Sequence, residues 1–158
     1  MQEVDFVLAE NTRKTKFLLE RYGVKNKILL FNDFSTKKKI QSLVNNISKG
    51  KNIALVSDAG TPLISDPGTN LVQAAIEEKI KVVPIPGASS LISALVASGL
   101  SAEKFIFHGF LPKKKGELKK LFEEIRFETK TQIFFESPKR IKKTLSIICL
   151  LYTSPSPR

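Results

Sequence analysis

The segment from Ser57 to Gly68 (SDAGTPLISDPG) has the residue types of a ligand-binding loop. Its glycines, Gly60 and Gly68, allow backbone conformations that other residues avoid, so the main chain can approach a ligand closely. Its two prolines fix the turns in advance, which lowers the entropic cost of presenting the loop. Asp58 and Asp66 can accept hydrogen bonds from amines or from ribose hydroxyls. We therefore expect this loop to bind a polar ligand.

A second interpretation stays open for this segment, namely an ordinary turn between a strand and a helix, with Asp66 capping the helix. The segment is not a phosphate-binding P-loop, because no Gly-Lys-Ser/Thr follows it, and it lacks the GxGxxG of dinucleotide-binding folds. Nucleoside triphosphates and dinucleotides are therefore poor candidates for its ligand.

Another turn, within residues 84–99 (PIPGASSLISALVASG), places small residues at a helix start directly after an apolar segment. Free backbone amides at a helix start can hold polar ligand atoms, and small side chains leave room for a ring. Tight packing of a helix against a sheet also needs small residues, so this segment alone supports both interpretations.

Short apolar segments alternate with amphipathic ones, which indicates strands alternating with helices. We expect strands at residues 4–9, 28–31, 53–56, 81–85, 105–108 and 131–135. We expect helices at residues 12–22, 36–48, 69–79, 88–98 and 113–127, and from 138 onward. This alternation predicts an α/β fold with a mostly parallel sheet flanked by helices. Ligand loops in such sheets follow the carboxyl ends of strands, where residues 57–68, 87–90 and 109–115 stand.

The composition is that of a globular protein with a basic excess. Of the 158 residues, 42% are hydrophobic and 26% are charged, which excludes intrinsic disorder, and the net charge is +11. No apolar run approaches the length of a membrane span, no signal peptide is visible, and the single Cys149 excludes an internal disulfide. We therefore expect a cytoplasmic protein without membrane association. The charge favours an anionic partner, above all nucleic acid, although a lysine-rich composition bias explains it equally well.

Five motifs follow one another along the chain: AENTRKT, VSDAGTPLISDPG, VVPIPGASS with SALVASG, FHGFLPKKK and FFESPKR. In this order and spacing they resemble the family of ribosomal RNA small subunit methyltransferases I, which belongs to the tetrapyrrole methylase-like (class III) S-adenosylmethionine-dependent methyltransferases. The resemblance covers roughly residues 4 to 145. It implies two α/β domains, a homodimer for the full-length protein, and 2′-O-methylation of a cytidine ribose in the 16S rRNA of the small ribosomal subunit.

The resemblance also implies S-adenosyl-L-methionine as the cofactor, bound by residues of two loops: Asp58, Ala59, Gly60, Thr61, Pro62, Ser65, Asp66, Gly87, Ala88, Ser89 and Ser90. Contacts to RNA phosphates are expected from Arg13, Lys113, Lys114, Lys115, Lys139 and Arg140. The stretch from Lys113 to Lys143 holds eleven basic and five acidic residues. Glu10 and Glu136 are the motif carboxylates outside the cofactor loops and the candidates for a general base, with structural pairing to Arg13 or Arg140 as the alternative. No metal site is predicted.

The chain departs from the family pattern in several places. Asn11 stands where the family motif Ala-Glu-Asp-Thr-Arg has a carboxylate, and an initial strand with a Gly-Asn-Leu turn is missing. We therefore expect a fragment, with an N-terminal α/β domain over residues 1–110, the truncated start of a second α/β domain over 111–147, and a non-native-looking tail over 148–158. Two other functions stay open. One is a tetrapyrrole (precorrin-type) methyltransferase, against which the basic stretch argues, and the other is a non-catalytic RNA-binding remnant.

Overall fold

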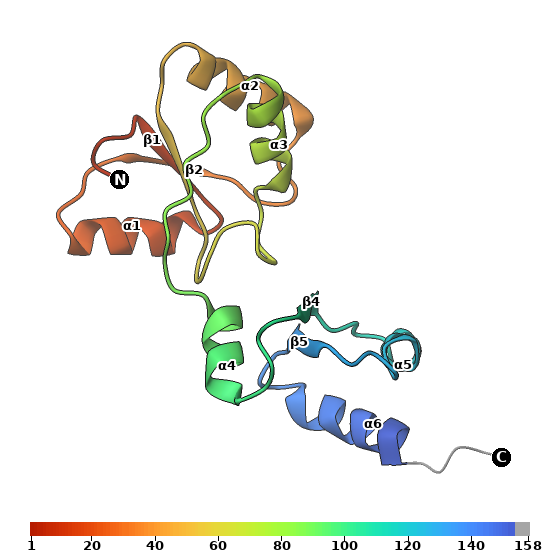
Figure 1. Ribbon diagram of the computed structural model, residues 1–158. Coiled ribbons are helices and arrows are strands. Elements are labelled where there is room, and N and C mark those ends of the chain that lie inside the picture. The colour runs from red at the N-terminus through yellow and green to blue at the C-terminus, as the bar shows by residue number, and fades with distance from the viewer. Residues whose placement is uncertain (154–158) are drawn as a thin grey trace. The chain divides into compact units, whose positions relative to one another are not determined.

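The computed structural model describes residues 1–153, and the chain divides into two compact units between Ser90 and Leu91 (Figure 1). The elements of the first unit are β1 (Phe6–Ala9), α1 (Thr12–Arg21), β2 (Lys27–Leu30), α2 (Lys37–Ser48), β3 (Ile53–Val56) and α3 (Thr69–Glu77). Those that follow are α4 (Ser90–Ser98), β4 (Phe105–Phe110), α5 (Lys115–Glu124), β5 (Thr131–Phe135) and α6 (Ile141–Thr153). All strand pairs are parallel and helices flank them, so the predicted α/β class is confirmed.

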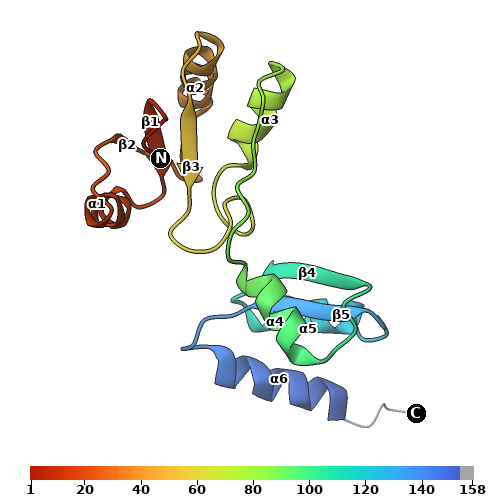
Figure 2. The same ribbon diagram turned by 60° about the vertical axis from the view of Figure 1, so that its left-hand side comes forward.

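β1 is the central strand of the first unit's sheet, which has the order β2–β1–β3. Its four residues are all buried, and an uninterrupted apolar sequence is what a parallel strand covered on both faces requires. Phe6 and Leu8 point to one face, where they pack in a core with Phe31, with Leu71 of α3 and with the apolar stripe of α2: Ile40, Leu43 and Val44. α1 lies on the other side of the sheet from α2 and α3 (Figure 1, Figure 2).

Side-chain caps set the starts of the first two helices. The Asn11 side chain accepts a hydrogen bond from the Lys14 backbone N–H before α1, and the Thr36 side chain accepts one from the Lys39 N–H before α2. Each cap satisfies a backbone donor that has no partner inside its helix. After α2, Gly50 takes a φ of +91°, which turns the chain toward β3.

The second unit has a two-stranded parallel sheet, β4–β5, with an irregular register. Phe107 lies opposite Ile133, but Phe110 lies opposite Phe135, so three steps along β4 match two along β5. This β-bulge includes Gly109, whose φ is +69°. The core of the unit contains Leu111, Leu118 and Phe122, with Phe134, Ile147 and Ile148 packed against them.

The strand predicted at Lys81–Ile85 was wrong, because residues 80–89 form neither a helix nor a strand. Val82, Val83 and Ile85 suggested a buried strand, but all three are exposed. Two prolines, at 84 and 86, have no N–H to donate to a neighbouring strand. The strands that the structure describes form two parallel sheets, β2–β1–β3 and β4–β5, and residues 80–89 belong to neither.

The division between the compact units lies nearer the N-terminus than the domain boundary expected after residue 110, and that boundary stays a prediction. α6 continues through Thr153, so residues 148–153 of the expected tail are helical, while 154–158 lie outside the described residues. In the part that the structure describes, no helix is both long and apolar enough to cross a membrane.

Candidate functional site

The carboxyl edge of the first unit's sheet brings together the loops that follow its three strands. Ala9 lies opposite both Leu30 and Val56, so the three strands end at the same level. The Phe31 N–H donates to the Ala9 carbonyl at 2.8 Å, which carries the pairing past the end of β2. The loops after β1, β2 and β3 therefore start at one edge, where parallel α/β sheets bind their ligands.

Four carboxylates gather at this edge: Glu10, Asp33, Asp58 and Asp66. Loss of solvation raises the pKa of Glu10 first; the other three negative charges raise it further, and Lys14 acts in the opposite direction. Loss of solvation also raises the pKa of Asp66, against a hydrogen bond with Ser57 that lowers it. The edge is thus locally acidic, although the chain as a whole carries a charge of +11.

Lys14, in the first turn of α1, partly neutralises this edge. Its ammonium group lies 2.7 Å from the Asp58 carboxylate, and this hydrogen bond raises the pKa of Lys14. Both groups remain accessible, with 66% of the lysine side chain and 26% of the aspartate side chain exposed. A cationic ligand group that binds Asp58 therefore competes with Lys14.

In the loop after β3, the main chain is open at one of the two glycines. Gly60 has a φ of +73°, and a Cβ built there meets no atom within 4 Å. Gly68 has a φ of +138°, and a Cβ there would lie 2.6 Å from the side chain of Leu55, so this glycine permits close packing instead. Gly68 is also the residue that precedes α3, so Asp66 does not cap that helix.

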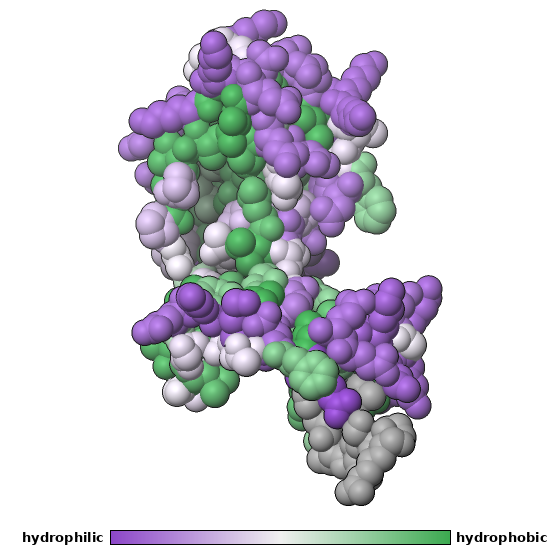
Figure 3. Space-filling model, turned by 45° about the vertical axis from the view of Figure 1, so that its right-hand side comes forward, coloured by the Kyte–Doolittle hydropathy of each residue, from purple (hydrophilic) through white to green (hydrophobic). Residues whose placement is uncertain are grey.

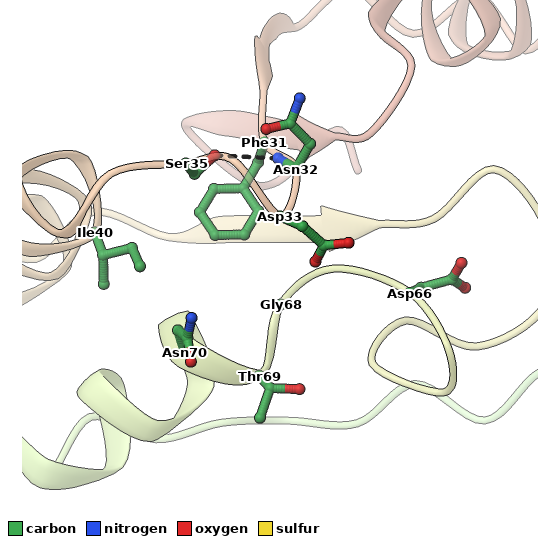
Figure 4. A pocket seen from close by; sticks show the side chains of 9 residues that line it. All are labelled: Phe31, Asn32, Asp33, Ser35, Ile40, Asp66, Gly68, Thr69 and Asn70. Carbon is green, nitrogen blue, oxygen red and sulfur yellow. Dashed lines mark hydrogen bonds between the residues drawn. The ribbon is translucent and has the colours of Figure 1, made fainter. Parts of the chain in front are cut away.

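A small pocket opens beside the loop, lined by Phe31, Asn32, Asp33, Ser35, Ile40, Asp66, Gly68, Thr69 and Asn70 (Figure 4). Its volume is about 60 Å³, which is too small for a nucleoside, since ligand pockets usually have about 300–1,000 Å³. The turn after β2 is held by the Ser35 hydroxyl, which accepts a hydrogen bond from the Asn32 N–H at 3.1 Å. Sequence reasoning missed Asn32 and Asp33, although they follow a predicted strand and the rule of strand ends pointed to them.

The second predicted cofactor segment is less organised. Gly87, Ala88 and Ser90 are exposed and Ser89 is half-buried. A Cβ at Gly87 would meet no atom within 4 Å, so its main chain is open to approach. The helix begins only at Ser90, later than expected, and Leu95 is its one buried residue.

Glu136, the second candidate base, is held in the second unit with 5% of its side chain exposed. Its carboxylate accepts hydrogen bonds from the Thr144 hydroxyl at 2.8 Å and the Ser137 N–H at 2.7 Å, and it pairs with Arg140 at 3.0 Å. Burial raises the pKa of Glu136, but these three contacts together lower it below its ordinary value. A carboxylate so engaged favours the structural alternative over general-base catalysis.

The predicted RNA-binding lysines are all exposed: Lys113, Lys114, Lys115 and Lys139. Lys114 forms an ion pair with Glu117 across 3.1 Å. Arg140 is only partly exposed, and Arg13 is exposed in the first turn of α1. Hydrophilic side chains, purple in Figure 3, cover much of the visible surface, with apolar side chains exposed between them.

Glu10 and Glu136 belong to different compact units. Within residues 1–153, Glu10 forms no ion pair with Arg13, so the structural alternative is not supported for this residue. Its pKa is raised, and Glu10 stays a candidate base. No group of three or more His, Cys, Asp or Glu side chains in the described part of the chain is arranged to hold a metal ion.

Comparison with known proteins places this geometry in context. Residues 1–155 match the family model of the tetrapyrrole (corrin/porphyrin) methylases. Three relatives, each named ribosomal RNA small subunit methyltransferase I, come from Streptococcus pyogenes serotype M6, Thermotoga maritima and Haemophilus influenzae, and are 47%, 46% and 48% identical to the chain. The matches cover 96%, 92% and 90% of this chain, but 53%, 65% and 50% of the relatives. The chain thus spans about half to two thirds of the length of these relatives.

Proposed function

Since the chain belongs to the tetrapyrrole (corrin/porphyrin) methylase family, we propose that it is part of an enzyme that methylates small-subunit ribosomal RNA. The reaction is transfer of a methyl group from S-adenosyl-L-methionine to the 2′-hydroxyl of a cytidine in 16S rRNA. The observation that carries this proposal is the match of nearly the whole chain, at close to half identity, to relatives of that name. Those names and the exposed lysines favour RNA over a small tetrapyrrole as the substrate.

The residues at the acidic edge fit S-adenosyl-L-methionine, which carries a sulfonium, an ammonium group and ribose hydroxyls. Asp58 and Asp66 offer carboxylate acceptors for the amine and the hydroxyls, and the open main chain at Gly60 allows close approach. Ala59, Thr61, Pro62 and Ser65 complete this loop, and residues 87–90 supply the second segment. When bound, the cofactor supplies an electrophilic methyl carbon.

The chain's own residues contribute to this reaction by aligning the methyl donor with the ribose hydroxyl and by accepting the proton of that hydroxyl. Alignment of donor and acceptor supplies much of the rate in a displacement of this kind. Glu10 stands at the same edge as the cofactor loop, and its raised pKa makes it a stronger base than an ordinary carboxylate. We assign Glu10 the role of accepting the proton of the ribose hydroxyl.

The two proposed binding functions, for the cofactor and for RNA, belong to parts of the chain with opposite local charge. The carboxylates at the sheet edge attract a cationic cofactor and repel RNA phosphates. The lysines at 113–115 and 139 lie in the second unit, where they can neutralise phosphates. The full-length protein is proposed to act as a homodimer in the cytoplasm.

Binding of the cofactor to a Gly60→Val variant tests the site. The valine side chain stands in the open space beside the loop, so we expect calorimetry to show at least a tenfold loss of affinity for S-adenosyl-L-methionine. Gly23→Val is the matched control, because Gly23 has a similar φ of +65°, a Cβ there also meets no atom within 4 Å, and it lies away from the loop, after α1. Equal affinities in the two folded variants would contradict the assigned loop.

A further inference from the structure

The guanidinium group of Arg140 contacts three groups inside the second unit. Its guanidinium group donates to the Pro112 carbonyl at 2.8 Å and to the Leu111 carbonyl at 3.3 Å. It also pairs with the Glu136 carboxylate at 3.0 Å. One planar, permanently charged group thus joins the loop after β4 to the segment that precedes α6.

The loop that Arg140 holds is the one that leads to the lysines. Leu111 is buried, with 5% exposed, and its N–H donates to the Phe135 carbonyl at 3.2 Å. The carbonyls of residues 111 and 112 have left the regular β4–β5 ladder and need donors, which Arg140 supplies. Lys113 follows immediately and is exposed.

Glu136 fixes Arg140 in turn. Thr144, with 3% exposed, and the Ser137 N–H donate to the Glu136 carboxylate, so both of its oxygens are engaged. The backbone N–H of Arg140 also donates, to the Ser137 carbonyl at 2.9 Å. The guanidinium group therefore has a fixed orientation before any ligand arrives.

We propose that Arg140 is a positioning residue, fixed by Glu136, that holds the Leu111–Pro112 backbone and so presents Lys113, Lys114 and Lys115 to RNA phosphates. This inference rests on the proposed RNA substrate and differs from a direct phosphate contact by Arg140. Flexible lysine side chains lose conformational freedom on binding, and a fixed backbone beneath them reduces the part of that loss that comes from the loop.

A double-mutant cycle separates positioning from contact. The four proteins are the wild-type chain, Arg140→Gln, the triple variant Lys113→Gln/Lys114→Gln/Lys115→Gln, and the combination of all four substitutions. Their affinities for a fluorescently labelled single-stranded oligoribonucleotide are measured at several salt concentrations. We expect Arg140→Gln to weaken binding about fivefold in the wild-type background and to have no further effect in the triple variant.

The salt dependence gives a second readout from the same titrations. In the triple-variant background, a positioning role predicts that Arg140→Gln leaves the slope of log K against log salt unchanged. A direct contact predicts that the slope becomes shallower by about 0.7, the value for one phosphate of a single strand. That result, or an independent loss of affinity in the triple background, would overturn the proposal.

Limited trypsin digestion tests the held loop without RNA. Trypsin cleaves after lysine, so release of the loop in Arg140→Gln should speed cleavage at residues 113–115 severalfold. Lys142→Gln, an exposed charge removal on α6, is the control and should not change that rate. Where Arg140→Gln does not fold, Arg140→Lys replaces it, because its single ammonium group keeps a charge beside Glu136 but cannot reach all three acceptors.

Trypsin digestion and RNA titration test different parts of the proposal, so their negative results can be told apart. Unchanged cleavage in the folded Arg140 variant would show that Arg140 does not hold the loop. Faster cleavage together with no RNA binding by the wild-type chain would instead overturn the RNA substrate, and with it the presentation of these lysines.

Discussion

Asp66 and Glu136 show how the surroundings of a carboxylate indicate its use. Loss of solvation is the largest influence on the pKa of both groups, but at Asp66 the neighbouring Asp58 and Asp33 add to it, whereas at Glu136 two hydrogen-bond donors and the Arg140 cation outweigh it. Asp66 therefore disfavours the folded state while ionised, and Glu136 favours it. A carboxylate that is kept at a cost to stability points to ligand binding, whereas a fully satisfied one points to structure.

Substitution of Asp66 by asparagine tests this difference. Because the pKa of Asp66 is raised in the folded state, its ionisation destabilises the fold above that pKa, and the penalty disappears once pH falls below its ordinary pKa, where both states bind the proton. We expect Asp66→Asn to raise the melting temperature near about pH 7 and to have little effect near about pH 3, while affinity for S-adenosyl-L-methionine falls.

Calorimetric melting at the two pH values, with cofactor binding measured on the same samples, provides the check. Thr69→Val, at an exposed position beside the same pocket, removes a polar group without removing a charge and should show no such pH dependence. A drop in melting temperature at neutral pH for Asp66→Asn would show that the Ser57 hydrogen bond outweighs the desolvation.

At the scale of elements, the sequence predicted the helices well because their signals are local. Asn11 and Thr36 cap helices from positions that a cap preference identifies, and the apolar spacing of α2 marks its buried face. The strand at Lys81–Ile85 was wrong because hydrophobicity alone cannot show whether a pairing partner exists. The bulge in β4 depends on a register between two strands and left no signal that we recognised.

Asn11 allows a test of the departure from the family motif. Its side chain caps α1, a task that aspartate performs equally well, so the amide need not mark a lost catalytic group. We expect Asn11→Asp to keep or slightly raise stability, since a negative charge suits a helix N-terminus, and Asn11→Ala to lose about 1 kcal/mol. Urea denaturation of both variants measures this, and equal stability of the alanine variant would rule out the cap as a contributor.

At the scale of the whole molecule, the basic stretch was visible in the sequence but the acidic edge was not. The lysines at 113–115 are contiguous, so counting charges found them. Glu10, Asp33, Asp58 and Asp66 are spread over more than a third of the chain, and only the parallel order β2–β1–β3 brings their loops to one edge. The composition of residues 57–68 predicted a ligand-binding loop, which stays a prediction, whereas the positions of Lys14 and Asp33 at this edge were found only in the structure.

This charge separation predicts that salt affects the two ligands differently. About four phosphate contacts, from the exposed lysines, give a slope of about −3 and a loss of RNA affinity of roughly 50-fold between about 50 and 200 mM salt. Affinity for the small cationic cofactor should change less than about threefold over the same range. Fluorescence anisotropy and calorimetry across that range measure the two, and an RNA affinity independent of salt would contradict the phosphate contacts.

The bulge in β4 determines what a deletion of one residue would do to the second unit. Side chains alternate along a strand, so residues an odd number apart face opposite ways; yet the rings of Phe107 and Phe110 both contact Phe135, at 4.8 and 5.4 Å. Because of the extra residue, each position after the bulge faces the side opposite to the one that regular alternation would give it. These positions include Leu111, whose carbonyl accepts from Arg140. Deletion of Gly109 would remove this extra residue, so it would turn the buried Leu111 toward the opposite face and shift the backbone that leads to Lys113.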